Sequence, residues 1–218
     1  MNVLIIGGGG REHALAHAIA KSPLLDKLIV SPGNPGIAKL ATCVTCADEP
    51  ALFDLIENAA IDLVVIGPEA PLVDGLADRL RLRGIRVFGP SQQAAMLEGS
   101  KAFARDFCDR HDIPQPAWQR FDNSAEACDF IRGHTADGHV IKADGLAAGK
   151  GVVVADTKDE AIAAITSMLD DAQFGHAGAS IVIEERITGI EASLFAMSDG
   201  EHAMMIGTAQ DYKRAGDG

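Results

Sequence analysis

The residues best suited to chemistry lie near the start of the chain, in the run GGGGREH at positions 7–13. This run follows four apolar residues typical of a buried strand and leads into a stretch with helical apolar spacing. Glycines let a backbone approach a ligand closely, and the free N–H groups at the start of a helix favour an anion. Arg11 adds a guanidinium that can contact a phosphate through two N–H groups. We therefore expect Gly8, Gly9, Gly10 and Arg11 to bind the phosphate of a small molecule.

Two other interpretations of this turn compete with phosphate binding. The dinucleotide fingerprint G-x-G-x-x-G would need a third glycine at position 12 or 13, where Glu12 and His13 stand. The spacing therefore argues against an NAD(P)-dependent oxidoreductase. A tight strand-to-helix turn without a ligand stays open as the second alternative.

Two further loops, at residues 32–36 and 67–71, are rich in glycine and proline and also follow apolar runs typical of strands. Ligands of open parallel sheets bind outside the carboxyl ends of the strands, so we expect the three loops to converge on one crevice. In the later loop, Glu69 follows Pro68 and could accept hydrogen bonds from sugar hydroxyls or from an amine. An exposed turn carboxylate without a ligand fits the sequence equally well.

A second cluster, VIKADGLAAGKGV at residues 140–152, has the pattern of a strand, a flexible loop and a second strand. It is not a Walker A motif, because no helix follows the loop and no Ser or Thr follows Lys150. A flexible loop that carries lysine over phosphates suits a different kind of ATP site. Lys142 lies at the end of a buried strand and needs an anionic partner, since burial of an unpaired ammonium is costly. A triphosphate would serve as that partner.

Two charged segments follow the apolar run at residues 181–183. Backbone groups from Glu185 to Ile187 could read an adenine base and Glu191 could hold ribose hydroxyls, although a strand with a charged end explains the same residues. The run DYKR at residues 211–214 brings opposite charges together at a turn, as a solvated charge cluster also would.

The elements that must position these residues alternate between strand and helix over the first hundred positions. Apolar runs predict strands at residues 3–6, 28–30, 42–46, 63–66 and 86–88, and helical spacing predicts helices at residues 12–20, 49–59 and 73–83. This alternation predicts an α/β fold with a parallel, doubly wound, Rossmann-like sheet. Two helices broken near Gly99 are expected over residues 92–110. Beyond them we expect an α+β region with strands at 118–121, 140–142, 152–155, 181–185, 192–197 and 202–206 and helices at 124–132 and 158–169.

Composition argues against several classes of function. The chain of 218 residues has 31 acidic and 19 basic side chains and a formal charge of −12, whereas nucleic-acid binding needs clustered Lys and Arg. No apolar run approaches the ~20 residues of a membrane helix, so we expect a cytoplasmic protein. Cys43 and Cys46 have a C-x-x-C spacing, but no second pair and no nearby His pair completes a zinc site. We therefore expect free thiols.

Taken together, these motifs resemble the phosphoribosylamine–glycine ligases, a family of the ATP-grasp superfamily that acts in purine biosynthesis. The resemblance rests on an ordered set of stretches from end to end of the chain, which read GGGGREHALA, SPGNPGIA, DLVVIGPEAPLVDGLADRLR, VFGPSQQAAMLEGSKAF, VIKADGLAAGKGVVVA, IVIEERITGIEAS and AQDYKRAGDG. It implies ATP-dependent ligation of glycine to 5-phosphoribosylamine through a glycyl phosphate, giving glycinamide ribonucleotide, ADP and phosphate. Another ATP-grasp carboxylate–amine ligase, or a non-catalytic nucleotide- or sugar-phosphate-binding fragment, stays open as an alternative.

The resemblance also implies roles for individual residues. Phosphoribosylamine would be bound by Gly8, Gly9, Gly10, Arg11, Pro68 and Glu69. ATP would be bound by Lys101, Lys142, Gly149, Lys150, Gly151, Glu184, Glu185, Ile187 and Glu191, with residues 145–151 as a lid over its phosphates. The groups near glycine and the transferred phosphate would be the catalytic residues Asp211, Lys213 and Arg214.

Family members are considerably longer than this chain, so the resemblance predicts an N-terminal fragment that is inactive by itself. It divides the chain into a Rossmann-like substrate domain at residues 1–103, a linker and helix at 104–120, an ATP-grasp lid at 121–190 and the start of an incomplete ATP-grasp core at 191–218. Ligands of Mg²⁺ (or Mn²⁺) are expected beyond Gly218, and no metal ligand is assigned within the chain. We expect a monomer whose partners are small molecules, with no nucleic acid and no membrane.

Overall fold

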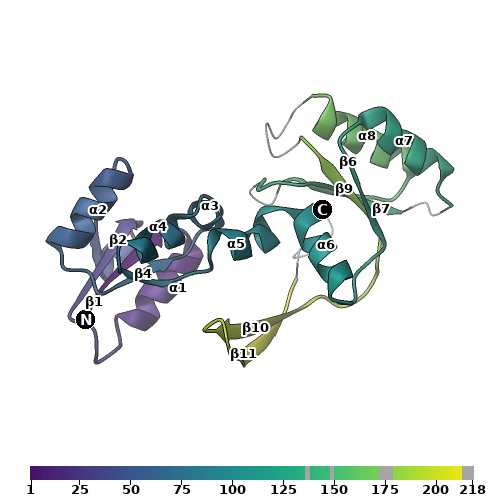
Figure 1. Cartoon of the computed structure of the whole chain (residues 1–218). Helices are drawn as coiled ribbons and strands as arrows, with labels where there is room; N and C mark the ends of the chain where they lie inside the picture. Colours follow the sequence, from purple (N-terminus) through teal and green to yellow (C-terminus); the bar gives the residue numbers. More distant parts are fainter. Residues whose placement is uncertain (136–137, 148–149, 172–178, 213–218) are drawn as a thin grey trace.

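The computed structural model describes residues 1–135, 138–147, 150–171 and 179–212 of the chain. Two regions with sheets and helices follow one another along the sequence, and a hairpin of two strands comes after them (Figure 1). None of the described helices is long and apolar enough to cross a membrane.

The first region is built on a five-stranded parallel sheet, which confirms the predicted doubly wound architecture. Its strands are β1 (Asn2–Gly7), β2 (Lys27–Pro32), β3 (Thr42–Cys43), β4 (Leu63–Ile66) and β5 (Arg86–Phe88), in the order β3-β2-β1-β4-β5. The sheet grows from β1 toward β3 on one side and from β4 toward β5 on the other, so the strand order reverses between β1 and β4. Open α/β sheets bind ligands at such a reversal, outside the carboxyl ends of the two strands.

Helices cover both faces of this sheet. They are α1 (Gly10–Ile19), the 3-10 helix η1 (Ile37–Lys39), α2 (Glu49–Asn58), α3 (Glu69–Val73), α4 (Leu76–Leu82) and α5 (Gln92–Gly99). Neighbouring residues of a strand point to opposite faces, so Leu4 and Ile6 of β1 pack in one core cluster with α2 and α4. Val3 and Ile5 pack in the other cluster with α1 and η1. Both faces are therefore buried, as the apolar strand sequences predict.

Two predicted elements of this region are wrong in extent. The pattern at residues 73–83 predicts one helix, whereas the chain forms α3, turns, and continues as α4. The turn lies at Gly75, whose φ of +83° falls in the left-handed region that favours glycine. The predicted strand at residues 42–46 is also shorter, because only Thr42 and Cys43 pair with β2.

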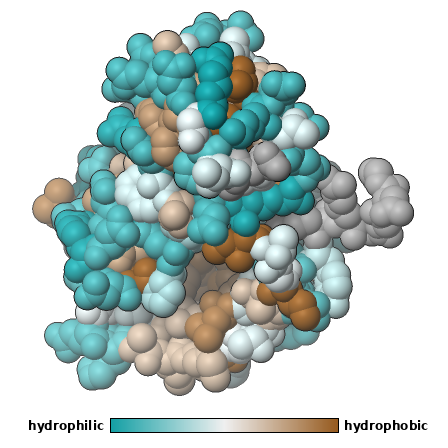
Figure 2. Space-filling view, turned by 90° about the vertical axis from the view of Figure 1, so that its right-hand side faces the viewer, coloured by the Kyte–Doolittle hydropathy of each residue, from teal (hydrophilic) through white to brown (hydrophobic). Residues whose placement is uncertain are grey.

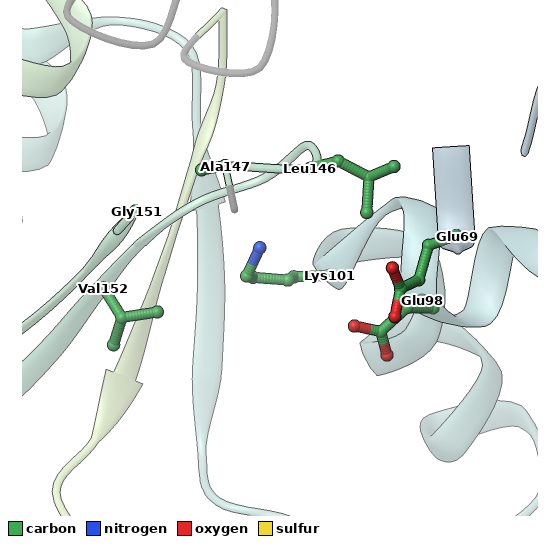
Figure 3. A pocket seen from close by; sticks show the side chains of 7 residues that line it. All are labelled: Glu69, Glu98, Lys101, Leu146, Ala147, Gly151 and Val152. Carbon is green, nitrogen blue, oxygen red and sulfur yellow. The ribbon is translucent and has the colours of Figure 1, made fainter. Parts of the chain in front are cut away.

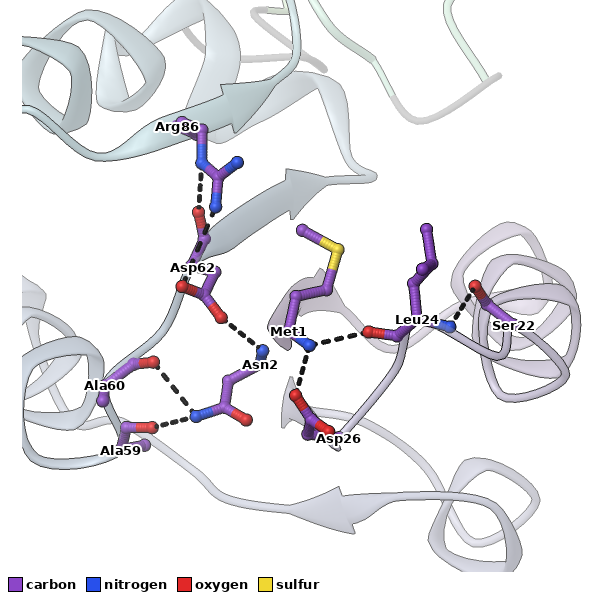
Figure 4. Close-up of polar contacts among 9 residues, drawn as sticks. All are labelled: Met1, Asn2, Ser22, Leu24, Asp26, Ala59, Ala60, Asp62 and Arg86. Carbon is purple, nitrogen blue, oxygen red and sulfur yellow. Dashed lines mark hydrogen bonds and ion pairs between the residues drawn. The ribbon is translucent and has the colours of Figure 1, made fainter.

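Polar contacts tie the start of β1 to its neighbours at the end of the sheet away from the carboxyl ends of the strands (Figure 4). The backbone N–H of Asn2 donates to Oδ2 of Asp62 at 2.7 Å, and the Asn2 side-chain amide donates to the carbonyls of Ala59 and Ala60. Nε of Arg86 donates to the carbonyl of Asp62 at 3.0 Å. These bonds fix β1, β4 and β5 relative to one another, and so fix the loops at their opposite ends.

The second region is an antiparallel sheet in the order β6-β9-β7-β8. Its elements are α6 (Lys101–Arg110), β6 (Trp118–Phe121), α7 (Ser124–Gly133), β7 (His139–Ala143), β8 (Val152–Ala155), α8 (Lys158–Leu169) and β9 (Ile181–Glu185). In Figure 1, α7 and α8 cover one face of the sheet and α6 lies on the other. Ile141 and Ile183 are buried against α7 and α8, so the alternating side chains of Lys142 and Glu184 point toward α6.

The last described elements, β10 (Ala192–Ser198) and β11 (Ala203–Gln210), pair only with each other among the described strands. β11 is longer than the strand predicted at residues 202–206, because its pairing with β10 continues to Gln210. Hydrophobic atoms gather in the lower half of Figure 2, at the height where Figure 1 shows the hairpin. The exposed large apolar side chains of the hairpin and of the residues just before it are Ile187, Ile190, Leu194, Phe195, Met197, Met204, Met205 and Ile206. An apolar surface of this kind is typical of a face that other protein covers.

Candidate active site

A buried glutamate shapes the turn between β1 and α1. Glu12 is 5% exposed, and its Oε2 accepts the N–H of Gly9 at 2.6 Å. A Cβ atom at Gly67 would lie 2.1 Å from Oε1 of Glu12, and one at Gly7 would lie 2.7 Å from its Cγ. These two glycines therefore make room for a protein side chain, a role that motif spacing did not reveal. A Cβ atom at Gly10 would meet no heavy atom within 4 Å, so the turn is open to a ligand there.

The three glycine- and proline-rich loops meet at the carboxyl ends of the strands, as predicted. The N–H of Gly33 donates to the carbonyl of Gly7 at 3.2 Å, and Nδ2 of Asn34 donates to the carbonyl of Gly8 at 2.9 Å. A Cβ atom at Gly8 would lie 2.5 Å from the carbonyl oxygen of Gly33. Close backbone contact between loops thus explains the glycine at position 8. Asn34 is a residue of this junction that the motifs did not single out.

Arg11 connects the first loop to the third. Its Nη1 donates to the carbonyl of Gly67 at 2.8 Å and to Oε1 of Glu69 at 2.7 Å. The hydrogen bond from Arg11 lowers the pKa of the Glu69 carboxyl, and the same bond raises the pKa of Arg11. Pro68 is the residue before α3, so Glu69 opens that helix. Exposed ion pairs contribute only about 0–1 kcal/mol to stability, so a ligand can replace Glu69 as the partner of Arg11 and replace Arg11 as the partner of Glu69.

Asp144, at the end of β7, fixes the start of α6. Its Oδ1 accepts the N–H of Ala102 at 2.8 Å and the hydroxyl of Ser100 at 3.0 Å. Its Oδ2 accepts the hydroxyl of Ser180 at 3.2 Å. One carboxylate therefore joins the helix N-terminus to the strand before the predicted lid. Asp144 lies within the motif at residues 140–152, but the motif did not reveal this role.

Lys101, the first residue of α6, is held by the same junction. Its backbone N–H donates to the carbonyl of Asp144 and its Nζ donates to the carbonyl of Gly145, each at 3.1 Å. Burial lowers the pKa of Lys101, because the charged ammonium loses part of its hydration. Its ammonium therefore lies at the first residue of the loop predicted to close over phosphates.

Lys142 has a carboxylate of the protein as its partner. Its Nζ lies 2.7 Å from Oε2 of Glu184, and Nη2 of Arg105 lies 2.7 Å from Oε1 of the same residue. Glu184 is 4% exposed, so it needs these cations, and removal of one partner from such a buried pair costs about 3–5 kcal/mol. The need for an anionic partner is therefore met by Glu184 within the described protein, where the sequence suggested a triphosphate. The motifs did not identify Arg105, which lies 79 residues before Glu184.

A cavity of about 410 Å³ lies between the β4–α3 loop and the lid loop. Glu69 and Glu98 border one side of it, and Lys101 reaches into it from α6 (Figure 3). Two residues predicted for different substrates, Glu69 for the amine and Lys101 for ATP, therefore line one space. The motifs did not single out Glu98, the penultimate residue of α5.

The opposite side of the cavity is apolar and consists of lid residues and the first residue of β8. It is formed by Leu146, Ala147, Gly151 and Val152. A Cβ atom at Gly151 would lie 2.6 Å from Cβ of Ala147, so close packing of the loop on itself requires glycine there. Gly151 therefore has a structural role in the lid, separate from the ATP contact predicted for it.

The remaining predicted site residues lie along the chain beyond the cavity. The N–H of Glu185 donates to the carbonyl of Ala117 at 2.8 Å, and Ile187 is exposed. The N–H of Asp211 donates to the carbonyl of Glu191 at 3.0 Å, so these two residues lie side by side at the base of the hairpin. Lys150 is exposed next to Gly151. Three predicted site residues lie outside the described residues: Gly149, Lys213 and Arg214.

Cysteine and acidic residues form no metal centre in the part of the chain that the structure describes. No group of three or more His, Cys, Asp or Glu side chains is placed there to hold a metal ion. Cys43, Cys46, Cys108 and Cys128 are all free thiols.

Comparison with known protein families identifies the family of this chain. Residues 1–98 match the family model "Phosphoribosylglycinamide synthetase, N domain", and residues 99–218 match "Phosphoribosylglycinamide synthetase, ATP-grasp (A) domain". The chain belongs to the phosphoribosylglycinamide synthetase family. It is 57% identical over 220 residues to the phosphoribosylamine–glycine ligase of Agrobacterium fabrum and 52% identical over 223 residues to that of Escherichia coli strain K12. The whole chain is covered in both alignments, but only 52% and 51% of these relatives.

Solved structures agree with this family. The crystal structure of the phosphoribosylamine–glycine ligase from Thermotoga maritima matches with a TM-score of 0.80 and 29% identity, over 98% of this chain and 51% of that one. The N5-carboxyaminoimidazole ribonucleotide synthetase from Thermus thermophilus matches with a TM-score of 0.69 and 19% identity, over 98% and 55%, which shows a shared fold. This member of the phosphoribosylglycinamide synthetase family thus spans about half the length of the curated relatives it matches.

Proposed function

We propose that the full-length protein joins glycine to 5-phosphoribosylamine at the expense of ATP, giving glycinamide ribonucleotide, ADP and phosphate. The observation that carries the proposal is the shared cavity. Glu69, from the loop assigned to the amine, and Lys101, assigned to ATP, line the same 410 Å³ space. A ligase that passes an activated carboxyl group to an amine needs its two sites to adjoin in this way.

The chemistry takes two steps. The glycine carboxylate attacks the γ-phosphorus of ATP, so that glycyl phosphate forms and ADP leaves. The amine nitrogen then attacks the carbonyl carbon, an N–C bond forms, the C–O bond to phosphate breaks, and the nitrogen loses a proton. Protein side chains act mainly by positioning the substrates and neutralising phosphate charge.

The amine substrate would bind where the loops after β1 and β4 meet. The open side of Gly10, the adjacent turn at Gly8 and Gly9, and Arg11 would hold the ribose 5-phosphate. Glu69, which follows Pro68, would then exchange its bond with Arg11 for bonds to the ribose.

ATP would bind across the second region. Lys101 and Lys142 would contact its phosphates, under a lid that carries Gly149, Lys150 and Gly151. The adenosine would lie along Glu185, Ile187 and Glu191, and Glu184 would hold Lys142 in place. Asp211, Lys213 and Arg214 would lie near glycine and the transferred phosphate.

We also propose that a divalent metal accompanies the nucleotide, as in other phosphoryl transfers. The described residues offer no cluster of ligands for it, so its ligands would belong to the rest of the protein. A cytoplasmic location and a monomeric state remain predictions of the same proposal.

The test is ADP release by the purified full-length protein, measured with all three substrates and Mg²⁺ and with each substrate omitted in turn. We expect release to require glycine and 5-phosphoribosylamine together. Lys101→Met should lower kcat/KM for ATP by about 100-fold or more, the usual effect of removing a donor aimed at developing charge. Lys39→Met, an exposed lysine on η1, is the matched control and should change nothing. No release with the complete mixture would refute the proposal.

The fold is also compatible with one other function. Carboxylate–amine ligases with other substrates share the fold, as the match to the Thermus thermophilus structure illustrates. Replacing glycine or 5-phosphoribosylamine by other carboxylates or amines in the same assay separates the two. Faster turnover with another pair of substrates would favour this second function.

A further inference from the structure

One carboxylate in the shared cavity has no role in the proposed binding scheme. Glu98 lies near the carboxyl end of α5, and in Figure 3 its side chain points into the cavity beside that of Glu69. Within residues 1–135, 138–147, 150–171 and 179–212, it forms no hydrogen bond or ion pair, whereas Glu69 is bound by Arg11. Glu98 is therefore the carboxylate of this pair that is available to a ligand.

The second chemical step needs such a group. When the amine nitrogen attacks glycyl phosphate, it becomes positively charged and must lose a proton for the amide to form. A positioned base contributes to this kind of proton transfer when it lies within hydrogen-bond reach of the nitrogen. It has to stand between the amine-binding loop and the phosphate-binding lysine, and Glu98 occupies that position.

The other polar side chains of the cavity are less suited to accept a proton. The ammonium of Lys101 has none of the lone pairs that an acceptor needs. Glu69 is bound by Arg11 in this structure, and in the proposed complex it binds the ribose, so its carboxylate is engaged in either state. Glu98 remains as the acceptor.

We propose that Glu98 is a catalytic residue that binds the amine nitrogen of the substrate and takes up its proton as the N–C bond forms and phosphate leaves. This inference rests on the proposed function of the same site. The proton moves from nitrogen to a carboxylate oxygen of Glu98, and the electrons of the broken C–O bond leave with inorganic phosphate. No further reactant is needed.

Charged groups of several neighbouring elements act on Glu98. Arg11 of α1 and Lys101 of α6 attract its negative charge, and Glu69 of α3 stands beside it. On α4, Asp78 accepts the N–H of Gln92 at the opposite end of α5. Arg79 of α4 pairs with Glu49 and Asp74. Glu98 therefore lies beside two cations and one carboxylate.

The experiment compares the full-length protein with its Glu98→Gln variant. We expect kcat to fall by about 100-fold, within the usual range for removal of a general base, and the KM for ATP and glycine to stay within about twofold. The decline of activity toward acid pH, where the base becomes protonated, should disappear from the variant. Glu98→Asp keeps the carboxylate on a shorter side chain and should restore part of the rate. Glu126→Gln, at an exposed position on α7, is the matched control.

Each result supports or overturns the inference. Because Glu98 is exposed, its substitution should leave the thermal unfolding temperature unchanged. A fall in kcat would then not be explained by unfolding of the variant. Unchanged kcat in Glu98→Gln, or a loss confined to the KM for 5-phosphoribosylamine with an unaltered pH profile, would overturn the role as a proton acceptor. An inactive wild-type protein would instead refute the proposed function, which separates the two failures.

Discussion

The carboxylate of Asp144 should control both the stability of the α6 junction and the affinity for ATP. It accepts hydrogen bonds from Ser100, Ala102 and Ser180 at 2.8–3.2 Å. Hydrogen bonds to a charged group contribute about 1.5–3 kcal/mol each, and water replaces part of this when the group is removed. We therefore expect Asp144→Ala to lower the free energy of unfolding by about 3 kcal/mol.

The effect on ATP follows from Lys101. Its ammonium donates to the carbonyl of Gly145 at 3.1 Å, next to Asp144, so loosening the junction moves the charge out of place. Loss of one charge-assisted contact of about 1.5–3 kcal/mol corresponds to a rise in the KM for ATP of about 10- to 100-fold. Asp144→Asn retains one acceptor oxygen, loses one of the three hydrogen bonds and should therefore show roughly a third of both effects.

Thermal and urea unfolding, together with the KM for ATP, measure these effects on the full-length protein. Asp122→Ala, an exposed aspartate in the loop after β6, is the matched control and should change neither quantity. If Asp144→Ala unfolds within about 0.5 kcal/mol of the wild type and keeps its KM for ATP within twofold, the carboxylate does not organise Lys101 and the reasoning fails.

Two further predictions concern the loops around the amine site. Gly67→Ala should lower the thermal unfolding temperature by several degrees, because its Cβ would lie 2.1 Å from the buried Glu12 carboxylate. The Cβ of Gly10→Ala meets only open space, so this control should change the unfolding temperature by less than about one degree. Equal effects of the two substitutions would contradict this account of the turn. Arg11→Ala should raise the pKa of Glu69, which NMR titration of ¹³C-labelled glutamate measures directly. Because the folded-state pKa of Glu69 is lowered, its stabilisation is present above the unfolded-state pKa and disappears as the pH falls through the folded value. The stability difference between wild type and Arg11→Ala, at most about 1 kcal/mol for an exposed pair, should therefore vanish in acid, and a difference that persisted there would count against the ion pair.

Much of the fold follows from local sequence patterns. The apolar run at Leu63–Ile66 and the helical spacing at Lys158–Leu169 predict β4 and α8 to the residue. Period and turn residues are local properties, so the sequence contains them directly. The helix predicted at residues 73–83 is wrong because Gly75 interrupts it, and a single glycine inside a helical pattern does not by itself reveal a left-handed turn.

The sequence motifs predicted the candidate site less completely than the fold. Motif spacing correctly brought three loops together, since the topology of a parallel sheet places the ends of its strands in one crevice. It did not predict which side chains pair across the molecule. Arg105 and Glu184 are 79 residues apart, and Asp144 joins a helix 42 residues earlier in the chain. Such pairings depend on how two regions pack, which no local pattern records.

Lys142 is half-buried, and one of its contacts could be predicted from the energetic cost of burying charge. The cost of burying an ammonium correctly required an anionic partner, and Glu184 supplies it at 2.7 Å. Arg105 binds the other oxygen of that carboxylate, so the three side chains together carry one net positive charge. A phosphate can therefore bind Lys142 without taking it from Glu184, because Arg105 keeps the carboxylate neutralised. Burial lowers the pKa of Lys101, so a bound phosphate would stabilise its charged ammonium. This is why we expect the two lysines to be positioned before ATP arrives, in a chain whose overall charge of −12 would otherwise repel it.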